Sequence, residues 1–199
     1  MRFLVFLVFI FYINPSYSAT DDWTSYGKGS GGGHFSKADE ITPENVKKLE
    51  RVWVHRSGDY KGGANSAGVK GGEYQTSFQA TPLLVDDTLF YCTSYNRVFA
   101  LDPETGKEKW VFDPKLKKDG RAILACRGLS SWKDETKSSS EKCHHRIMGV
   151  TIDAELFSID GKSGEICNDF GNNGRVNLRE GLGEYPALYY WSTSPPAII

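Results

Sequence analysis

One segment of the chain recurs without a gap, and this repeat restricts the folds that the sequence can adopt. Residues 93–106, TSYNRVFALDPETG, align with residues 151–164, TIDAELFSIDGKSG, 58 positions further on. Both copies place an apolar stretch before a turn of the type Asp-x-x-Thr/Ser-Gly, and Phe112 falls on Phe170 at the same offset. A glycine that adopts a positive φ in such a turn lets two antiparallel strands follow each other closely. The repeat therefore predicts two copies of one β-hairpin.

Further strand-like sequence precedes the first copy and completes a set of four. The four runs are residues 81–85, 88–93, 97–101 and 109–112, and the first two are separated by the turn pair Asp86-Asp87. Four short antiparallel strands in succession are typical of one β-propeller blade, which usually has about 40 to 50 residues. We therefore predict one four-stranded antiparallel sheet over residues 81–113 and a second sheet that begins near Ile147.

The repeat interval is longer than one blade, which predicts an insertion. Residues 115–142 are rich in Lys, Asp and Ser and have no sustained strand pattern, so we assign the insertion to them. Residues 194–199 repeat residues 80–85 at about twice the interval, which indicates the start of a third copy. A closed propeller needs at least four blades, so we expect either the front part of a longer protein or one part of an assembly of chains. We favour the first, because a terminus inside an apolar strand leaves open sheet edges.

Composition agrees with an all-β fold and excludes one class of partner. The 24 Lys and Arg residues are balanced by 25 Asp and Glu residues, for a formal net charge of −1. A chain without a positive excess is not expected to bind nucleic acid. The 21 Gly and 8 Pro residues, with 13% aromatics, favour many short strands and turns over a helical bundle.

The first 18 residues have the features of a signal peptide. Arg2 precedes eleven consecutive apolar residues at 3–13, and Ser16 and Ser18 place small side chains where signal peptidase reads them. The alternative is a membrane anchor, but eleven residues are too few for a hydrocarbon core of about 30 Å. We predict export to the periplasm after cleavage behind Ser18 or Ala19, and we assign the propeller segment to residues 19–199.

Between this leader and the first repeat, two local elements are expected. Thr42 followed by Pro43 predicts the start of a helix that extends to Leu49. A strand is predicted over residues 51–56 around Trp53, and it should pair outside the first blade, because the N-terminal strand of a closed ring completes the last blade. We expect Trp53, like Trp110, Phe112 and Phe170, to pack between neighbouring blades.

The four cysteines, Cys92, Cys126, Cys143 and Cys167, become disulfide candidates in an exported protein. Cys126 and Cys143 flank much of the predicted insertion, and a bond between them would close a loop of about 17 residues and add roughly 3 kcal/mol of stability. We therefore predict this pair and leave the other two cysteines free as core residues. His144 and His145 adjoin Cys143, but the spacing lacks a second pair of ligands, so no metal site is predicted there.

An ordered series of short motifs extends over nearly all of residues 20–199. They read WTSYG at 23–27, GHFS at 33–36, ITPENVKKL at 41–49, VW at 52–53, ATP at 80–82, RVFALD at 97–102, CRGLSSW at 126–132, FGNNG at 170–174 and SPP at 194–196. This series resembles the N-terminal part of the pyrroloquinoline quinone (PQQ) dependent dehydrogenases of the periplasm. The glucose and quinate dehydrogenase branch is the most similar, since Cys126-Arg127-Gly128 replaces the vicinal Cys-Cys pair of methanol dehydrogenases.

The resemblance implies an eight-bladed β-propeller, of which this chain supplies about the first two blades. It also implies a PQQ cofactor over a Ca²⁺ ion, and hydride transfer to the quinone from the hydroxyl-bearing carbon of an alcohol, polyol or sugar. Electrons would leave to ubiquinone or a cytochrome c, and the full protein could associate with a membrane. The catalytic base and the metal ligands are expected beyond residue 199, so no residue of this chain is named for either role.

Three residues match cofactor-binding positions of that family. Arg127 matches the arginine beside the quinone, Thr193 matches a hydroxyl donor before Pro-Pro, and Gln79 lies where the family often has a glutamate. The alternatives are an ordinary surface arginine, a turn residue and an amide without contact to the cofactor. A non-enzymatic periplasmic propeller scaffold would also explain the repeat, but it would not explain the motifs at 126–128 and 23–53.

Overall fold

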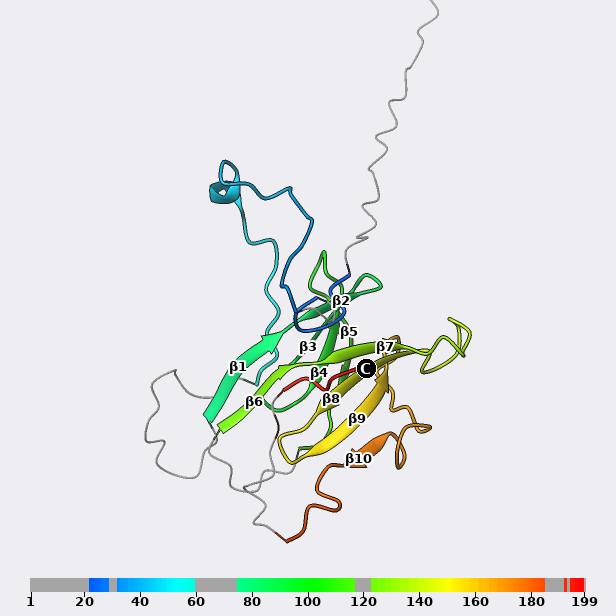
Figure 1. Cartoon of the computed structure of the whole chain (residues 1–199). Coiled ribbons are helices and arrows are strands. Elements are labelled where there is room, and N and C mark those ends of the chain that lie inside the picture. The colour runs from blue at the N-terminus through cyan, green and yellow to red at the C-terminus, as the bar shows by residue number, and fades with distance from the viewer. Residues whose placement is uncertain are drawn as a thin grey trace, which may run out of the picture.

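The structure of the chain is a computed structural model that describes residues 22–28, 32–59, 75–116, 123–184, 192 and 194–198. Two four-stranded antiparallel sheets and one two-stranded parallel ribbon make up the regular structure of these residues (Figure 1). The predicted signal peptide at residues 1–18 lies outside the described residues. Within the described ranges, no helix has the length and apolar character that a membrane span requires.

The first sheet has the order β2 (Leu83–Val85), β3 (Thr88–Cys92), β4 (Val98–Leu101) and β5 (Glu108–Phe112). Each strand pairs antiparallel with the next along the chain. Asp86 and Asp87 both have positive φ, 47° and 50°, which is the conformation that a tight two-residue hairpin requires. The predicted four-stranded sheet over residues 81–113 is therefore confirmed.

The second sheet has the order β7 (Ser130–Lys133), β8 (His145–Val150), β9 (Glu155–Asp160) and β10 (Arg175–Asn177). It begins at β7, so the prediction that it begins near Ile147 is wrong. The predicted insertion is also too long, because β7 and the preceding β6 (Ile123–Gly128) lie inside residues 115–142. At the 58-residue offset these strands do not align with β1 (Gln75–Thr81) and β2, and they stand beside Lys-, Asp- and Ser-rich loops, which hid their apolar pattern.

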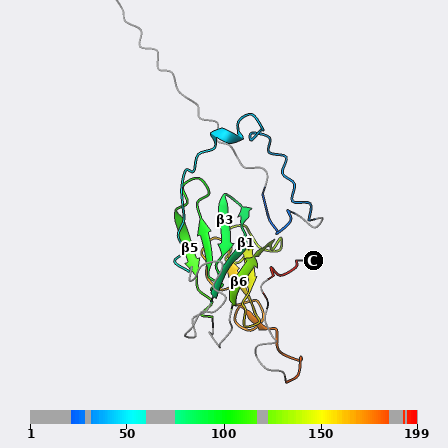
Figure 2. The ribbon, with the colours of Figure 1, turned by 90° about the vertical axis from the view of Figure 1, so that its left-hand side faces the viewer.

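An apolar core joins the two sheets, which stack on each other (Figure 2). Phe90, Val98 and Leu83 of the first sheet are at most 1% exposed, as are Phe157 and Ile159 of the second. Trp110 and Phe112 of β5 pack against the edge of this core, as predicted. Burial of large apolar side chains between sheets is the main favourable contribution to folding in such an arrangement.

Two tryptophans occupy equivalent places on successive blades. Trp110 lies over Gly164, where an added Cβ would approach its Cε3 to 2.6 Å, and its Nε1 donates to the Gly161 carbonyl at 3.3 Å. Trp53 lies in the same way over Gly106, at 2.5 Å, and its Nε1 donates to the Pro103 carbonyl at 3.1 Å. The segment around Trp53 is therefore placed against the first blade as β5 is placed against the second.

The local predictions for residues 42–56 need correction. The predicted helix is only a short 3-10 helix, η1 (Val46–Lys48), and Asn45 rather than Thr42 is its N-cap residue. The Asn45 side chain instead accepts a hydrogen bond from the Thr42 N–H at 2.8 Å, which closes a turn before the helix. Residues 51–56 are extended but form no sheet, so the predicted strand is wrong although its place outside the first blade is as expected.

The disulfide prediction is also wrong. Cys92 is bonded to Cys126, with a Cα–Cα distance of 6.0 Å, and Cys143 is bonded to Cys167, with a distance of 5.8 Å. The prediction treated Cys126 and Cys143 as the two ends of one loop. Strand β7 lies between them instead, and β6 carries Cys126 to the end of β3, where Cys92 lies.

Candidate functional site

A parallel ribbon carries two of the three predicted cofactor residues. Strand β1 (Gln75–Thr81) leads into the first sheet, β6 leads into the second, and the two strands run parallel to each other (Figure 1). Parallel strands need a long connection between them, and here the whole first blade provides it. The ribbon therefore brings together segments that lie about 48 residues apart in the sequence.

The pairing of this ribbon is irregular at the predicted site. Phe78 pairs with Cys126 and Thr81 pairs with Gly128, so two residues of β1 lie opposite Arg127 alone. Such a bulge bends the strand and redirects the side chains beside it. Gln79 is one of the two bulged residues, and its Oε1 accepts a hydrogen bond from Arg127 Nε at 3.2 Å. The structure thus brings Arg127 and Gln79 into direct contact, which spacing alone did not predict.

A row of hydrogen bonds connects this pair to the first blade. Gln79 Nε2 donates to Ser77 Oγ at 2.9 Å, and Ser94 Oγ donates to the Ser77 carbonyl at 3.0 Å. Ser94 is only 4% exposed and lies in the turn between β3 and β4, whereas Arg127 and Gln79 are exposed. The row therefore begins at a buried anchor and ends at an accessible guanidinium.

The inner side of the ribbon is fixed to both blades. The Cys92–Cys126 disulfide holds β6 to β3, directly beside Arg127. Asn96 is 1% exposed, its Nδ2 donates to the Ala125 carbonyl at 3.4 Å, and its Oδ1 accepts from the Ile152 N–H at 2.9 Å. Residues just before Arg127 are thus tied to the first sheet and to the turn of the second.

A third segment of the chain reaches the same place. At Gly128 an added Cβ would lie 3.5 Å from the Thr81 carbonyl oxygen and 3.6 Å from Pro195, so Gly128 stands between the two segments. Ser130 Oγ also donates a hydrogen bond to the Pro196 carbonyl. The predicted hydroxyl donor Thr193 itself lies outside the described residues, so its role stays a prediction.

The charge at this site suits an anionic ligand. Among the ion pairs of the described residues, none involves Arg127, and its hydrogen bond to Gln79 uses only Nε. Neither terminal nitrogen of the guanidinium takes part in that bond. A planar guanidinium of this kind matches the geometry of a carboxylate or a pair of adjacent carbonyl oxygens. The donor set therefore fits one side of a planar tricarboxylate such as PQQ.

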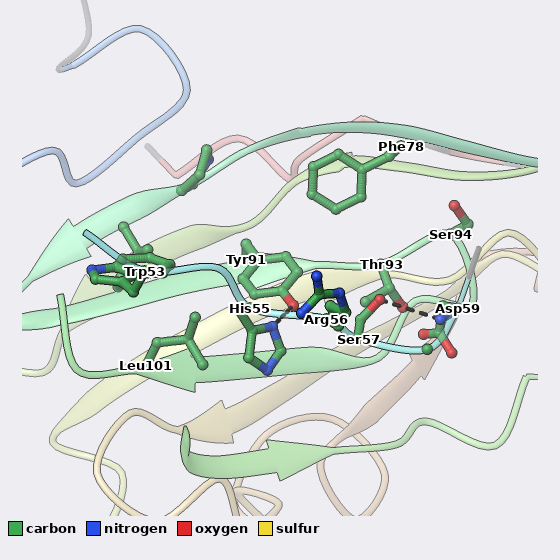
Figure 3. Close-up of a pocket in the computed structure, with 13 residues that line it drawn as sticks. Trp53, His55, Arg56, Ser57, Asp59, Phe78, Tyr91, Thr93, Ser94 and Leu101 are labelled. Carbon is green, nitrogen blue, oxygen red and sulfur yellow. Dashed lines mark hydrogen bonds between the residues drawn. The ribbon is translucent and has the colours of Figure 1, made fainter. Parts of the chain in front are cut away.

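A second candidate is a cavity of about 570 Å³ beside the extended segment that follows Trp53 (Figure 3). It is lined by Trp53, residues 55–59, Phe78, Pro82 and residues of β3, β4 and the turn between them. At its wall the Tyr91 hydroxyl lies 2.6 Å from His55 Nδ1, and His55 Nε2 lies 2.7 Å from a Glu108 carboxylate oxygen. Burial raises the pKa of Tyr91 to about 12, with smaller contributions from Glu108 and Asp59, so this phenol stays neutral.

The internal repeat relates residues beside this cavity to equivalent residues of the second sheet. Phe99 and Leu101 on its side of the first sheet align with Phe157 and Ile159 of the second sheet. Those two residues pack against the preceding blade in the apolar core. The face of the first sheet beside the cavity therefore corresponds to the face of the second sheet that packs on the first blade. The sequence analysis did not name His55, which lies two residues after Trp53.

Two further groups of potential metal ligands among the described residues are engaged in other contacts. Cys143, Cys167 and Asp169 lie close together, but the two sulfurs are joined to each other. Hydrogen bonds from Arg146 and Lys137 lower the pKa of Asp169 to about 2, so this carboxylate stays ionised and paired. His145 Nε2 lies 2.9 Å from Ser131 Oγ, and burial lowers the pKa of this imidazole.

Comparison with known proteins identifies the family of the chain. Residues 23–199 match the PQQ family model described as "Glucose/ethanol/alcohol dehydrogenase, beta-propeller domain". Quinoprotein glucose dehydrogenase A of Acinetobacter calcoaceticus is 36% identical over 194 residues, which cover 91% of this chain and 23% of that protein. The quinate/shikimate dehydrogenase (quinone) of Acinetobacter baylyi is 34% identical, with 89% of this chain and 23% of that protein covered.

A solved structure supports the fold. The quinohemoprotein alcohol dehydrogenase of Pseudomonas putida HK5 matches with a TM-score of 0.64 at 21% identity, over 90% of this chain and 22% of that one. The chain thus spans about a quarter of the length of the relatives that it matches. The predicted resemblance and the propeller fold are both confirmed. From its two stacked blades and the family model that matches almost all of them, the chain belongs to the PQQ-dependent quinoprotein dehydrogenase family.

Proposed function

We propose that this chain forms the N-terminal blades of a periplasmic dehydrogenase that uses PQQ to oxidise an alcohol, polyol or sugar. The observation that carries the proposal is the contact between Arg127 and Gln79. Two residues expected at a cofactor come together from distant segments, on an accessible ribbon. The names of the relatives, which include glucose, glycerol and quinate dehydrogenases, support the reaction class.

In this proposal the residues of the chain bind and orient, and do not transfer protons. PQQ when bound accepts the hydride that the substrate loses. Arg127 would face one of its carboxylates or quinone oxygens through the terminal nitrogens of the guanidinium. Charge-assisted hydrogen bonds of this type are about twice as strong as neutral ones. Thr193 would add a hydroxyl donor beside the Pro195 segment that packs on Gly128.

The remaining parts of the proposed enzyme come from outside this chain. We assign the Ca²⁺ ligands and the catalytic base to further blades of a longer polypeptide, because the relatives are about four times as long. The open packing face beside Trp53 supports this, since a further blade would cover it. Ubiquinone or a cytochrome c is the proposed electron acceptor. Two disulfides support export to the periplasm, where such bonds form and persist.

The test is a titration of PQQ, with Ca²⁺ present, into the full polypeptide and its Arg127→Ala variant. We expect the substitution to weaken cofactor binding by about 2 to 4 kcal/mol, because a carboxylate or carbonyl loses its charged partner. Arg51→Ala is the matched control, since Arg51 is also exposed but lies outside the ribbon. Unchanged affinity in the Arg127 variant would remove the ribbon from the cofactor site. Failure of the wild-type protein to bind PQQ would favour the scaffold alternative.

A further inference from the structure

We propose that His55, Tyr91 and Glu108 form a polar key that selects the N-terminal strap, residues 51–59, as the segment that covers the first blade. The strap lies on the face of the first sheet that points away from the second blade. The key distinguishes the strap from strand β5, which covers the second blade in a closely similar way. The inference concerns how the blades assemble and goes beyond the binding of a cofactor.

The strap and β5 are alike in sequence and in position. Residues 51–55 read RVWVH and β5 reads EKWVF, so both contain Trp-Val followed by a side chain with a ring. The two tryptophans lie over equivalent turn glycines. The valines that follow them, Val54 and Val111, are 47% and 46% exposed. Apolar packing alone would therefore allow either segment to cover either blade.

The residue after that valine is where the two segments differ. In β5 it is Phe112, whose ring centroid lies 5.2 Å from that of Phe157 on the second blade. In the strap it is His55, whose ring centroid lies 5.0 Å from that of Phe99, the residue that aligns with Phe157. His55 thus takes the place of Phe112 at the equivalent interface, and it brings two polar nitrogens into that interface.

The first blade provides a partner for each of these nitrogens. The Tyr91 hydroxyl lies 2.6 Å from Nδ1 of His55 (Figure 3), and a Glu108 carboxylate oxygen lies 2.7 Å from Nε2. A carboxylate only accepts hydrogen bonds, so Nε2 carries a proton, and a neutral imidazole then accepts the Tyr91 O–H at Nδ1. The His55 side chain is 10% exposed and Tyr91 is 7% exposed. Loss of either partner would therefore leave a polar group away from water.

The second blade offers neither partner at the equivalent positions. Gly149 aligns with Tyr91, because each pairs across its sheet with the aligned phenylalanine. Ile166 aligns with Glu108, because each pairs with the equivalent residue of the preceding strand. A histidine that entered the second interface would lose both hydrogen bonds. A phenylalanine that entered the first would leave the tyrosine hydroxyl without its acceptor.

A second contact of the strap has the same selectivity. Arg97 donates to the Asp59 carboxylate from Nε at 2.9 Å and from Nη2 at 2.6 Å. On the second blade Glu155 aligns with Arg97, and it forms an ion pair with Arg175 of β10. A segment that carries Asp59 would meet a carboxylate there instead of a guanidinium. Repulsion between like charges therefore opposes docking of the strap on the wrong blade.

The experiment measures hydrogen exchange of residues 51–59 in the full polypeptide and in three variants. His55→Phe places the residue of β5 in the strap, and we expect exchange of the strap to rise at least about tenfold, because the Tyr91 hydroxyl loses its acceptor. His55→Phe/Tyr91→Phe removes that hydroxyl as well, so we expect exchange to fall back toward the wild-type rate. Arg51→Ala, at an exposed position of the same strap, is the control and should exchange as wild type.

The two His55 variants distinguish a polar key from simple packing. If His55 only fills space, the double variant exchanges at least as fast as His55→Phe, and this result refutes the key. Unchanged exchange in His55→Phe also refutes it. Exchange of β9 is followed in parallel, and a rise there as large as in the strap contradicts a local role of His55. PQQ binding is a separate measurement, and a wild-type polypeptide that does not bind PQQ overturns the proposed function but not the key.

Discussion

The two blades share one backbone design but are joined by side chains that do not repeat. In the turn between the second and third strands, Asn96 and Ala154 occupy the same place with φ of 57° and 64°. The turn bonds are equivalent, since Thr93 and Thr151 each donate from N–H to the carbonyl four residues on, at 2.9 and 2.8 Å. Asn96 also makes side-chain bonds to Ala125 and Ile152, which the alanine at the equivalent position cannot make. The repeat thus encodes the turn, and the unrepeated side chain of Asn96 adds a link between the two blades and the ribbon.

The outer turns show the same contrast. Asp102 and Asp160 each accept hydrogen bonds from the backbone and hydroxyl of the residue three positions on. Asp102 lies at the surface, whereas Asp160 is 4% exposed and also accepts from the Cys143 N–H at 2.6 Å. The turn of the second blade is therefore packed against a neighbouring segment, whereas Trp53 lies over the turn of the first blade.

Removal of a disulfide is expected to have the largest effect on stability, and the two disulfides join different elements. Replacing Cys92 and Cys126 with Ala should cost about 4 kcal/mol of unfolding free energy, since the bond closes a loop of 34 residues. The Cys143 and Cys167 pair closes a loop of 24 residues, and its removal should cost about 3.5 kcal/mol. Urea unfolding measures both losses. Only the first pair should also weaken PQQ binding, because it holds the strand of Arg127.

Peptide mapping without reduction checks the pairing itself. Peptides that link Cys92 to Cys126 and Cys143 to Cys167 are expected. A linked Cys126–Cys143 peptide would contradict the structure and with it the placement of β6.

A smaller contrast is expected between the two glycines that face tryptophans. Gly164→Ala should cost about 3 kcal/mol, because its φ is positive and the new Cβ would meet Trp110, which is held in β5. Gly106→Ala should cost about half as much, because Trp53 lies on a segment outside any sheet and can move away. Urea midpoints of the two variants test this. Equal losses would mean that the Trp53 segment is as firmly held as a strand.

The turn residues give the next contrast. Asn96→Ala should cost about 2 kcal/mol, because it leaves the buried Ile152 N–H without its acceptor and puts alanine at a positive φ. Ala154→Gly should instead stabilise by about 0.5 kcal/mol, since glycine adopts that conformation without strain. Thermal unfolding of both variants is the measurement. A destabilised Ala154→Gly would indicate that its methyl group matters more than its backbone angle.

The sequence predicted some parts of the fold and not others. The turns at residues 93–97 and 102–106 were predictable because the repeat shows them twice, and the first two strands of the first sheet because Asp86-Asp87 separates two apolar runs. Strands β6 and β7 were not, since they do not align with β1 and β2 at the repeat offset and polar loops surround them. The pairing of β1 with β6 depends on contacts between segments that are far apart in sequence, which no local pattern encodes.

The candidate site was likewise predicted only in part. Arg127 and Gln79 were named from motifs, but their contact arises from a bulge that only the paired strands reveal. The row through Ser77 and Ser94 was missed, because serines in strands and turns are too common to single out. The disulfide pairing failed for a related reason, since sequence distance is a poor guide to which cysteines meet across two blades.

The smallest expected effect is a difference in acid sensitivity between the two outer turns. Burial raises the pKa of Asp160, but hydrogen bonds from the Cys143, Ser163 and Lys162 N–H groups outweigh it, so the pKa falls below its ordinary value of 3.8. A carboxyl whose pKa is lowered by folding stabilises the protein above its unfolded pKa, and this contribution is lost as the pH falls through the lowered value. Asp160→Asn should therefore lose on the order of 1 kcal/mol at pH 7 and show a weaker decline in stability between pH 5 and pH 2. The pKa of Asp102 is lowered as well, chiefly by Thr105, but its surface position predicts a smaller change for Asp102→Asn. Urea midpoints at pH 7, 4 and 3 measure the stability of both variants. If the pH dependence of stability becomes equally weak in both, burial of the second turn does not increase the stability that its carboxylate provides.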